Sequence, residues 1–279
     1  MSIFSITSGR PLIVAFEGWN DAGEAASTAV KAVIDRFDLV QGFSVETELY
    51  YDYQLVRPTI EFTTDDERRI HWPTASLFVP ADLATNVTVL LGTEPSRSWP
   101  TFAATFLDEA LAADITGIIV VGSMLADVPH SRPIEVTCTS DNSEVRALLN
   151  CERSQYEGPI GIPTVFAQFA EQVGIPAVAV WASVPHYVHN SPSPKVARAL
   201  MGKIMEITGI TIDTAEIDAE SVTWEKGVNE MISGDEDLSE YIGQLEEKRD
   251  AETSAEASGD ALAEEFEKYL RDSGENPGN

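Results

Sequence analysis

Predominantly apolar runs alternate with helical patterns over residues 1–211. The runs lie at 12–16, 87–91, 117–121 and 177–184, and a helical pattern follows each of them. Runs that are apolar on both faces are typical of strands buried between two layers of helices. The alternation therefore predicts an α/β core in which a mostly parallel mixed sheet is covered by helices on both sides.

Residues 42–79 interrupt this alternation. Apolar and polar residues alternate over 44–51, and two short strand-like segments at 59–63 and 68–72 flank the turn signal Asp65-Asp66. Alternation with a period of two is typical of strands that have one solvated face. We expect antiparallel strands near an edge of the sheet here.

The stretch LIVAFEGWNDAG, residues 12–23, joins the first predicted strand to the first predicted helix, and Gly18, Asn20 and Asp21 end its apolar run. Asp21 is the natural N-cap of the helix, and Glu24 three residues later completes a capping-box pattern. The helix N-terminus then points back at the strand end, which is a common place for ligands in α/β proteins. Capping and ligand binding both stay open for Asp21.

Beyond the core only helical patterns remain. They predict helices at about 214–232, 235–249 and 258–271, and the last two have a narrow apolar stripe on an acidic background. The Ala- and Ser-rich stretch AETSAEASGD, residues 251–260, is expected to be a loose linker. Residues 272–279 are expected to be disordered.

Charge separates the two parts of the chain. The whole chain has a net charge of -28, and residues 212–279 hold 21 acidic and 5 basic side chains. We therefore expect an α/β core domain at 1–211 and an acidic helical C-terminal segment at 212–279 with a disordered tail. Acidic helix faces commonly keep a protein soluble. The more specific alternative is that the acidic charge binds a dedicated basic partner. A polyanion of this size argues against nucleic acid or an anionic membrane as partner, because phosphate binding needs clustered Lys and Arg.

Cysteine use and the N-terminal sequence indicate a cytoplasmic protein. Cys138 and Cys151 have no metal-binding spacing and are expected to be reduced and structural. The N-terminal residues MSIFSITSGR lack the charged and apolar regions of a signal peptide. No apolar run approaches the ~20 residues that a membrane-spanning helix needs.

Candidate chemistry lies in four loops at the carboxyl ends of the predicted strands, because ligands of open α/β sheets bind there. Three of the four histidines are in these loops, and a histidine near a carboxylate can serve as a general base or a metal ligand. The simpler alternative is that these side chains hold the loop backbone. The candidate pocket comprises Glu17, Asn20, Asp21, Glu94, Ser123, His130, His186 and His189, and Asp127 is expected on the same rim.

Motifs for specific reactions are missing. The sequence has no GxSxG elbow, no GxxxxGK[ST] phosphate loop, no GxGxxG fingerprint and no HExxH pair. Ser123 stands where a nucleophile could stand, but no flanking motif supports it. We predict no metal and no cofactor, and we assign no catalytic residue.

Five segments together resemble a known family. They are PLIVAFEGWNDAGEAAS, GTEPSRSWPTFAATFLD, GSMLADVPHSRP, YEGPIGIPTVF and VWASVPHYVHNSPSPKVARAL, and they span about residues 10–210. The set is similar to the bacterial, actinobacterial-type branch of the proteasome assembly chaperone family. The resemblance implies a three-layer core of the phosphorylase/hydrolase-like type and a self-associating protein, with a homotrimer favoured. It supplies no reaction and no catalytic residue.

The resemblance favours a non-enzymatic, self-assembling chaperone or scaffold that helps to assemble a proteasome-like or other complex. Some relatives dock on the proteasome through a C-terminal hydrophobic-Tyr-any-residue ending, whereas this sequence ends Asn276-Pro277-Gly278-Asn279, so docking of that kind is not expected. The alternative is a small-molecule hydrolase or phosphorylase at the strand-end pocket. It predicts that Asp21, His130 and His186 face one another.

Overall fold

The computed structural model describes residues 9–81 and 85–274, with side chains as far as residue 255. Among the described residues, one sheet has the strand order β2-β5-β6-β1-β7-β9-β8. Its centre is parallel and is formed by β6 (Thr88–Thr93), β1 (Pro11–Glu17), β7 (Gly117–Ala126) and β9 (Ala177–Pro185). The predicted mostly parallel sheet is confirmed.

Antiparallel strands form both edges of this sheet. β2 (Val40–Ser44) and β5 (Ala75–Val79) lie beyond β6, and β8 (Val136–Thr139) lies beyond β9. The parallel strands are buried on both faces, whereas the residues of β2 are exposed or partly exposed. The sequence pattern reflects this difference, because only a strand covered on both sides needs a continuous apolar run.

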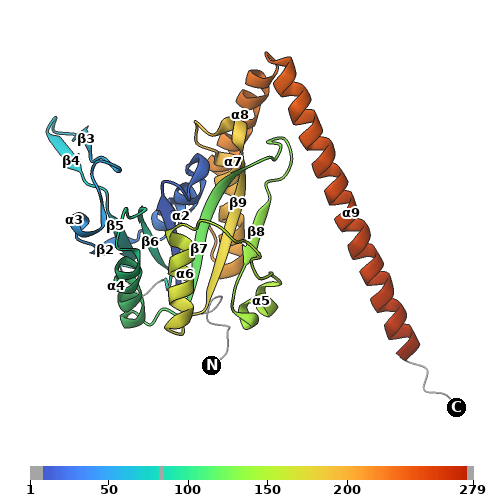
Figure 1. The fold of residues 1–279 in the computed structure, drawn as a ribbon, viewed down its shortest axis with the longest axis horizontal. Coiled ribbons are helices and arrows are strands. Elements are labelled where there is room, and N and C mark those ends of the chain that lie inside the picture. The colour runs from blue at the N-terminus through green and yellow to red at the C-terminus, as the bar shows by residue number, and fades with distance from the viewer. Residues whose placement is uncertain (1–8, 82–84, 275–279) are drawn as a thin grey trace.

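Helices cover both faces and give the three layers of the predicted α/β architecture (Figure 1). One face carries α2 (Ala25–Arg36) and α7 (Pro194–Thr208), and the other carries α4 (Trp99–Ala112) and α6 (Ile162–Gln172).

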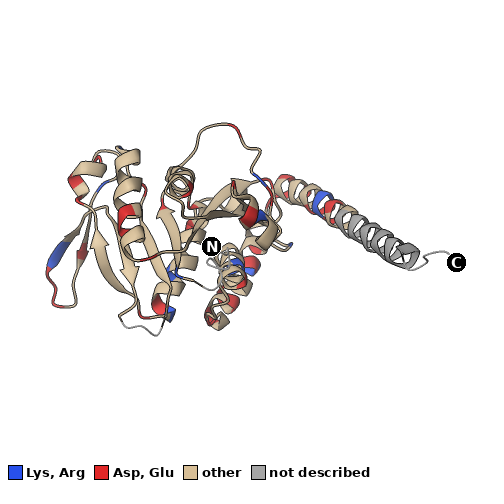
Figure 2. Cartoon of the chain, turned by 90° about the horizontal axis from the view of Figure 1, so that it is seen from below, with Lys and Arg blue, Asp and Glu red and all other residues tan. Residues whose placement is uncertain are grey.

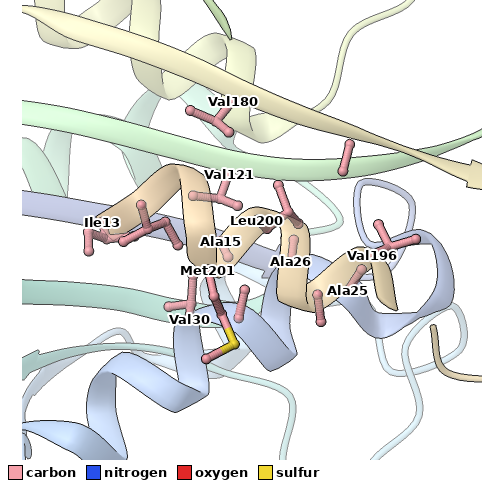
Figure 3. Packing of buried hydrophobic residues seen from close by; sticks show 14 of the residues in the cluster. Ile13, Ala15, Ala25, Ala26, Val30, Val121, Val180, Val196, Leu200 and Met201 are labelled. Atoms are coloured by element: carbon pink, nitrogen blue, oxygen red, sulfur yellow. The ribbon is translucent and has the colours of Figure 1, made fainter. Parts of the chain in front are cut away.

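Successive side chains of β1 point to opposite layers. Ile13 and Ala15 join the hydrophobic cluster with α2 and α7, whereas Leu12, Val14 and Phe16 join the one with α4 and α6. In Figure 3, Val30 of α2 and Leu200 of α7 lie close to Ala15 of β1.

An excursion between β2 and β5 leaves the main sheet. Residues Thr47–Tyr50 form a short helix, α3, so the strand expected over 44–51 is wrong there. A strand would send Tyr50 and Tyr51 to opposite faces, but both side chains are buried on the same side of the sheet as α4.

The hairpin predicted after this segment is confirmed. β3 (Thr59–Phe62) and β4 (Arg68–His71) pair antiparallel around a turn that contains Asp65 and Asp66. They form a two-stranded sheet of their own, which stands away from the body of the molecule (Figure 1).

Two helices follow the core. α8 (Ala215–Ile232) packs on α7 and adds Ile217, Val228 and Ile232 to the cluster beneath α2 and α7. The division expected at residue 211 therefore falls between two helices that share one hydrophobic cluster.

α9 (Glu236–Gly274) is one continuous helix, so the linker expected at 251–260 is wrong. That stretch contains no proline and is rich in Ala and Glu, which favour helix. The helix also includes the first residues of the tail expected to be disordered, and residues 275–279 lie outside the described part. No helix in the described ranges has the length and apolar character needed to cross a membrane.

The first part of α9 is held against the segment between β7 and β8. Arg132 donates from Nε to Asp250 Oδ1 over 2.7 Å, and Ser131 donates to Glu246. Ile242 and Leu245 of this part of α9 are buried. Beyond it, α9 extends away from the body (Figure 1).

Candidate functional site

The candidate residues lie at the carboxyl ends of β1, β6, β7 and β9, where the sheet topology brings four loops to one edge. The hydrogen bonds, ion pairs and ring contacts divide them into two groups. We call the set Glu17, Asn20, Asp21, Glu94 and Ser123 the β1 junction. We call the set Asp127, His130, His186 and His189 the histidine cluster.

Asn20 is the centre of the β1 junction and is only 1% exposed. Its Nδ2 donates to Glu94 Oε1 over 2.8 Å, and the same oxygen accepts from the Ile162 backbone N–H over 3.0 Å. Glu94 thereby joins the loop after β1 to the first turn of α6. Gly161 packs so closely that a Cβ there would lie 2.0 Å from Asn20 Oδ1.

The Asp21 side chain caps α2, although Asp21 lies four residues before the first residue of the helix. Its Oδ1 accepts from the backbone N–H groups of Ala26, at 2.8 Å, and Ser27, at 3.0 Å. The predicted capping role is confirmed, but the capping box is wrong, because a short 3-10 turn (Ala22–Glu24) separates Asp21 from the helix and Glu24 has a φ of 51°. Burial raises the pKa of Asp21, although the hydrogen bonds from Ser27 and Ala26 oppose the shift.

Ser123 closes the junction from β7. Its Oγ donates to the Ala22 carbonyl over 2.8 Å, and its N–H donates to the Asn20 carbonyl over 2.9 Å. The hydroxyl is completely buried and holds the loop backbone. Glu17 lies at the rim, where it pairs with Lys31 of α2 at 2.9 Å.

His130 is buried, and both of its ring nitrogens have hydrogen-bond partners. The Tyr187 hydroxyl accepts from the His130 backbone N–H at 2.8 Å and lies 2.9 Å from Nδ1, to which it donates when Nδ1 carries no proton. On the other side of the ring, Nε2 lies 3.3 Å from Asn229 Oδ1 and carries the proton. Burial lowers the pKa of His130, and the hydrogen bond to Asn229 and the charge of Glu225 oppose the shift.

This geometry predicts a pH-dependent stability. The folded pKa of His130 lies below the unfolded value of 6.5, so the unfolded state binds the proton more tightly. The contribution is complete above that value and is lost as the pH falls below it. We expect the free energy of unfolding to fall by about 1 kcal/mol more in the wild type than in His130→Gln between about pH 7.5 and pH 5.5, measured by urea denaturation.

The control for this experiment is His189→Gln, because His189 is exposed and its ring has one hydrogen bond within the described part of the chain, at 2.9 Å from Nδ1 to the His186 carbonyl. This variant should keep the wild-type pH dependence. Equal slopes in the wild type and His130→Gln would contradict the assignment.

His186 and Asp127 form the outer part of the histidine cluster. His186 Nδ1 lies 3.3 Å from Asp127 Oδ1, which also accepts from the Tyr241 hydroxyl at 3.3 Å. The His186 ring makes edge contacts with Tyr187 and Tyr241, at centroid distances of 5.5 and 5.7 Å.

Asn229 of α8 and Tyr241 of α9 therefore complete this cluster, and the sequence interpretation missed both. They follow the loop residues by about a hundred positions, and no local pattern marks them.

The two networks have no residue in common among the described hydrogen bonds and ion pairs. Asp21 is bonded to α2, and His130 is bonded to Tyr187 and α8. A hydrolase or phosphorylase site was expected to bring Asp21, His130 and His186 together. In the structure these three side chains have separate hydrogen-bond and ion-pair partners. The polar side chains instead join loops to helices.

Known proteins are similar to this chain in sequence and in fold. Residues 15–232 match the model of the PAC2 family. A PAC2 family protein from Streptomyces avermitilis is 33% identical with a TM-score of 0.76, and the match covers 83% of this chain and 99% of that one. A proteasome-assembly chaperone homologue from Mycobacterium tuberculosis is also 33% identical, with a TM-score of 0.75 and the same coverage.

A more distant structure shares the fold. An archaeal proteasome activator from Pyrococcus furiosus is 12% identical with a TM-score of 0.62, over 80% of this chain and 93% of that one. None of the curated proteins matches this sequence.

Proposed function

Because the chain belongs to the PAC2 family, we propose that it is a non-enzymatic, self-assembling cytoplasmic chaperone that helps to assemble a proteasome-like complex. The observation that carries the proposal is the likeness to the proteasome-assembly chaperone homologue of M. tuberculosis over nearly the whole of that protein. The chaperone role, the proteasome subunit as partner and the homo-oligomer, with a trimer favoured, are all part of this proposal.

An apolar surface around the β1 junction is the surface that we assign to the partner subunit. We use the name strand-end surface for the exposed apolar residues at these strand ends, which are Trp19, Met124, Leu125, Tyr156 and Ile160. Met124 and Leu125 are consecutive in β7 and point to its opposite faces. Trp19 and Ile160 are chain neighbours of Asn20 and Gly161, which pack together. Exposed apolar groups gathered over rigid loops are typical of a protein-binding surface.

The rigid base of this surface supports binding over catalysis. Asn20, Asp21 and Ser123 are buried, and the Asn20 Nδ2, the Asp21 carboxylate and the Ser123 hydroxyl make hydrogen bonds that hold the loop carrying Trp19 to its surroundings. Met124 and Leu125 lie on β7, directly after Ser123. A preformed surface loses little conformational entropy when a partner binds. The hydrolase or phosphorylase alternative has no comparable support, because its candidate groups belong to separate networks.

The proposal is tested by direct binding to proteasome subunits. The purified chain is mixed with separately expressed α and β subunits of an actinobacterial proteasome, and complexes are measured by size-exclusion chromatography with light scattering. We expect a complex with at least one subunit type and faster formation of full rings. We expect the double variant Trp19→Asp/Leu125→Asp to weaken binding at least tenfold, because it replaces two exposed apolar side chains of the surface with charges.

The matched control is Val173→Asp, because Val173 is also an exposed apolar residue but follows the C-terminus of α6, at the opposite edge of the sheet. It should bind like the wild type. Failure of the wild type to bind either subunit would contradict the proposed function, and equal loss in both variants would contradict the assigned surface.

A further inference from the structure

Cys138 and Cys151 meet at the β8 edge of the sheet, although the helix α5 (Ser143–Leu149) separates them in the sequence. Thr139 of β8 forms a parallel bridge with Glu152, and the backbone N–H of the residue after Thr139 donates to the Glu152 carbonyl over 3.0 Å. The two cysteines directly precede the two residues of this bridge. The register of the bridge therefore places Cys138 and Cys151 opposite each other.

The spacing of this pair fits a disulfide bond. Neighbouring strands lie about 4.8 Å apart, and a disulfide joins residues whose Cα atoms are about 4.4 to 6.8 Å apart. Both thiols are free, and the Cys138 thiol has the Cys151 thiol as a hydrogen-bonding partner. The two sulfur atoms can therefore be joined with little movement of the backbone.

The surroundings of the two thiols suit them to different steps. Cys138 packs against the hydrophobic cluster beneath α2 and α7, and burial together with the neighbouring Cys151 thiol raises its pKa to about 12. Cys151 directly precedes the exposed segment 152–160. Because the thiolate is the attacking form of cysteine, Cys138 is poorly suited to attack a reagent in solution. An attack by Cys138 on the adjacent Cys151 is intramolecular, and its proximity favours it.

We propose that Cys138 and Cys151 are a redox site, which small-molecule disulfides convert to a disulfide bond within the chain. The Cys151 sulfur attacks one sulfur of the reagent, forms a mixed disulfide and releases the first reagent thiol. The Cys138 sulfur then attacks the Cys151 sulfur, forms the bond between the cysteines and releases the second reagent thiol. The protons of the two cysteines pass to the two released thiolates. The cysteines are thereby oxidised by two electrons, and the reagent is reduced by two.

The new bond would close a loop around α5 and anchor the start of segment 152–160. In the reduced chain this start is held by the backbone bridge and by the ion pair between Arg153 and Asp141, at 2.9 Å, whose side chains are exposed. An exposed ion pair contributes little to stability, whereas a cross-link reduces the conformational freedom of the unfolded chain. Oxidation should therefore stabilise the protein and restrict this segment.

Oxidation is tested on the purified full chain with bis(2-hydroxyethyl) disulfide, which is uncharged. Figure 2 shows acidic residues spread over the helices and loops, and the net charge of -28 would repel an anionic reagent. Thiols that remain are alkylated, and the chain is weighed by mass spectrometry. We expect a product about 2 Da lighter than the reduced chain, with no alkyl group. Its equilibrium constant of formation should be at least tenfold higher in buffer than in concentrated urea, because the fold holds the thiols together.

Single variants test the order of the two attacks. Cys138→Ser should trap the mixed disulfide on Cys151, because the thiol that resolves it is missing. Cys151→Ser should react with the reagent at least tenfold more slowly than Cys138→Ser, because its remaining thiol is the one that burial keeps protonated. Both rates are measured by mass spectrometry on the folded chain.

The anchoring is tested by comparing the oxidised and reduced wild type. We expect the oxidised form to melt at least about 3 °C higher. Trypsin should cut after Arg153 at least fivefold more slowly in the oxidised form, because Arg153 lies two residues beyond the new bond. Cleavage after Arg69 is the internal control, because the β3–β4 hairpin is not paired with the main sheet, and its rate should not change on oxidation.

The possible results separate the parts of this inference. Two thiols that are still alkylated, a cross-link between two chains, or equal equilibrium constants in buffer and urea would overturn the redox site. Faster reaction of Cys151→Ser than of Cys138→Ser would overturn the order of attack. A disulfide that changes neither the melting temperature nor the cleavage after Arg153 would overturn the anchoring. None of these measurements involves a proteasome subunit, so their failure is distinct from a failure of the proposed function.

Discussion

Replacing Gly161 with alanine is expected to lower the free energy of unfolding by about 3 kcal/mol, through overpacking and the loss of a buried hydrogen bond. The new Cβ would lie 2.0 Å from Asn20 Oδ1 and 2.6 Å from its Cγ and Nδ2. Asn20 is buried, and a shift of its amide group away from the new Cβ would disturb its 2.8 Å bond to Glu94 Oε1. Because Glu94 also accepts from the Ile162 N–H, the start of α6 would be disturbed as well.

Urea denaturation measures this effect, and Gly227→Ala is the matched control. Gly227 lies inside α8, and a Cβ there meets no atom within 4 Å. The same chemical change should therefore stabilise the protein, by up to about 1 kcal/mol, through helix propensity. A Gly161→Ala variant that is as stable as the wild type would show that the β1 junction can relax and is not the rigid base that we describe.

The central sheet is predictable from the sequence because burial on both faces dictates composition. Residues 12–16 are all apolar, and each of them is fully buried in the structure. The helix at Thr47–Tyr50 is not predictable in this way, because Val45 and Glu46 begin an alternation that suits an exposed strand. Only the tertiary contacts show that Tyr50 and Tyr51 both face the core.

The candidate side chains are predictable individually, but their partners are not. The topology of a parallel sheet brings the loops after β1, β6, β7 and β9 to one edge. Which side chains then meet depends on contacts between distant positions, such as Asn20 with Glu94 and His130 with Asn229. A loop histidine near a carboxylate has the same sequence pattern whether it catalyses a reaction or supports a helix. Because His130 is buried and its ring is bonded to Tyr187 and to Asn229 of α8, we interpret it as a residue that supports the helix.

Replacing Asp21 with alanine is expected to lower the free energy of unfolding by about 3 kcal/mol, because it leaves two buried backbone donors unsatisfied. Ala26 and Ser27 are buried at the start of α2, and their N–H groups donate only to Asp21 Oδ1 among the described hydrogen bonds. Water cannot replace the carboxylate without opening the contact between the helix and the β1 junction. The loss is measured by urea denaturation at neutral pH.

Asp21→Asn separates capping from charge, because asparagine keeps an Oδ1 acceptor for both donors but does not ionise. It should retain most of the stability that alanine loses. Burial raises the folded pKa of Asp21 above the unfolded value of 3.8, so the folded state binds the proton more tightly. The stabilisation from this proton is fully present below 3.8 and is lost as the pH rises through the folded pKa. Acidification should therefore stabilise the wild type relative to Asp21→Asn, and a stability difference between the two that does not change with pH would contradict a buried, titrating Asp21. If alanine is tolerated as well as asparagine, the carboxylate does not hold α2, and the capping role assigned to the GWNDAG loop fails with it.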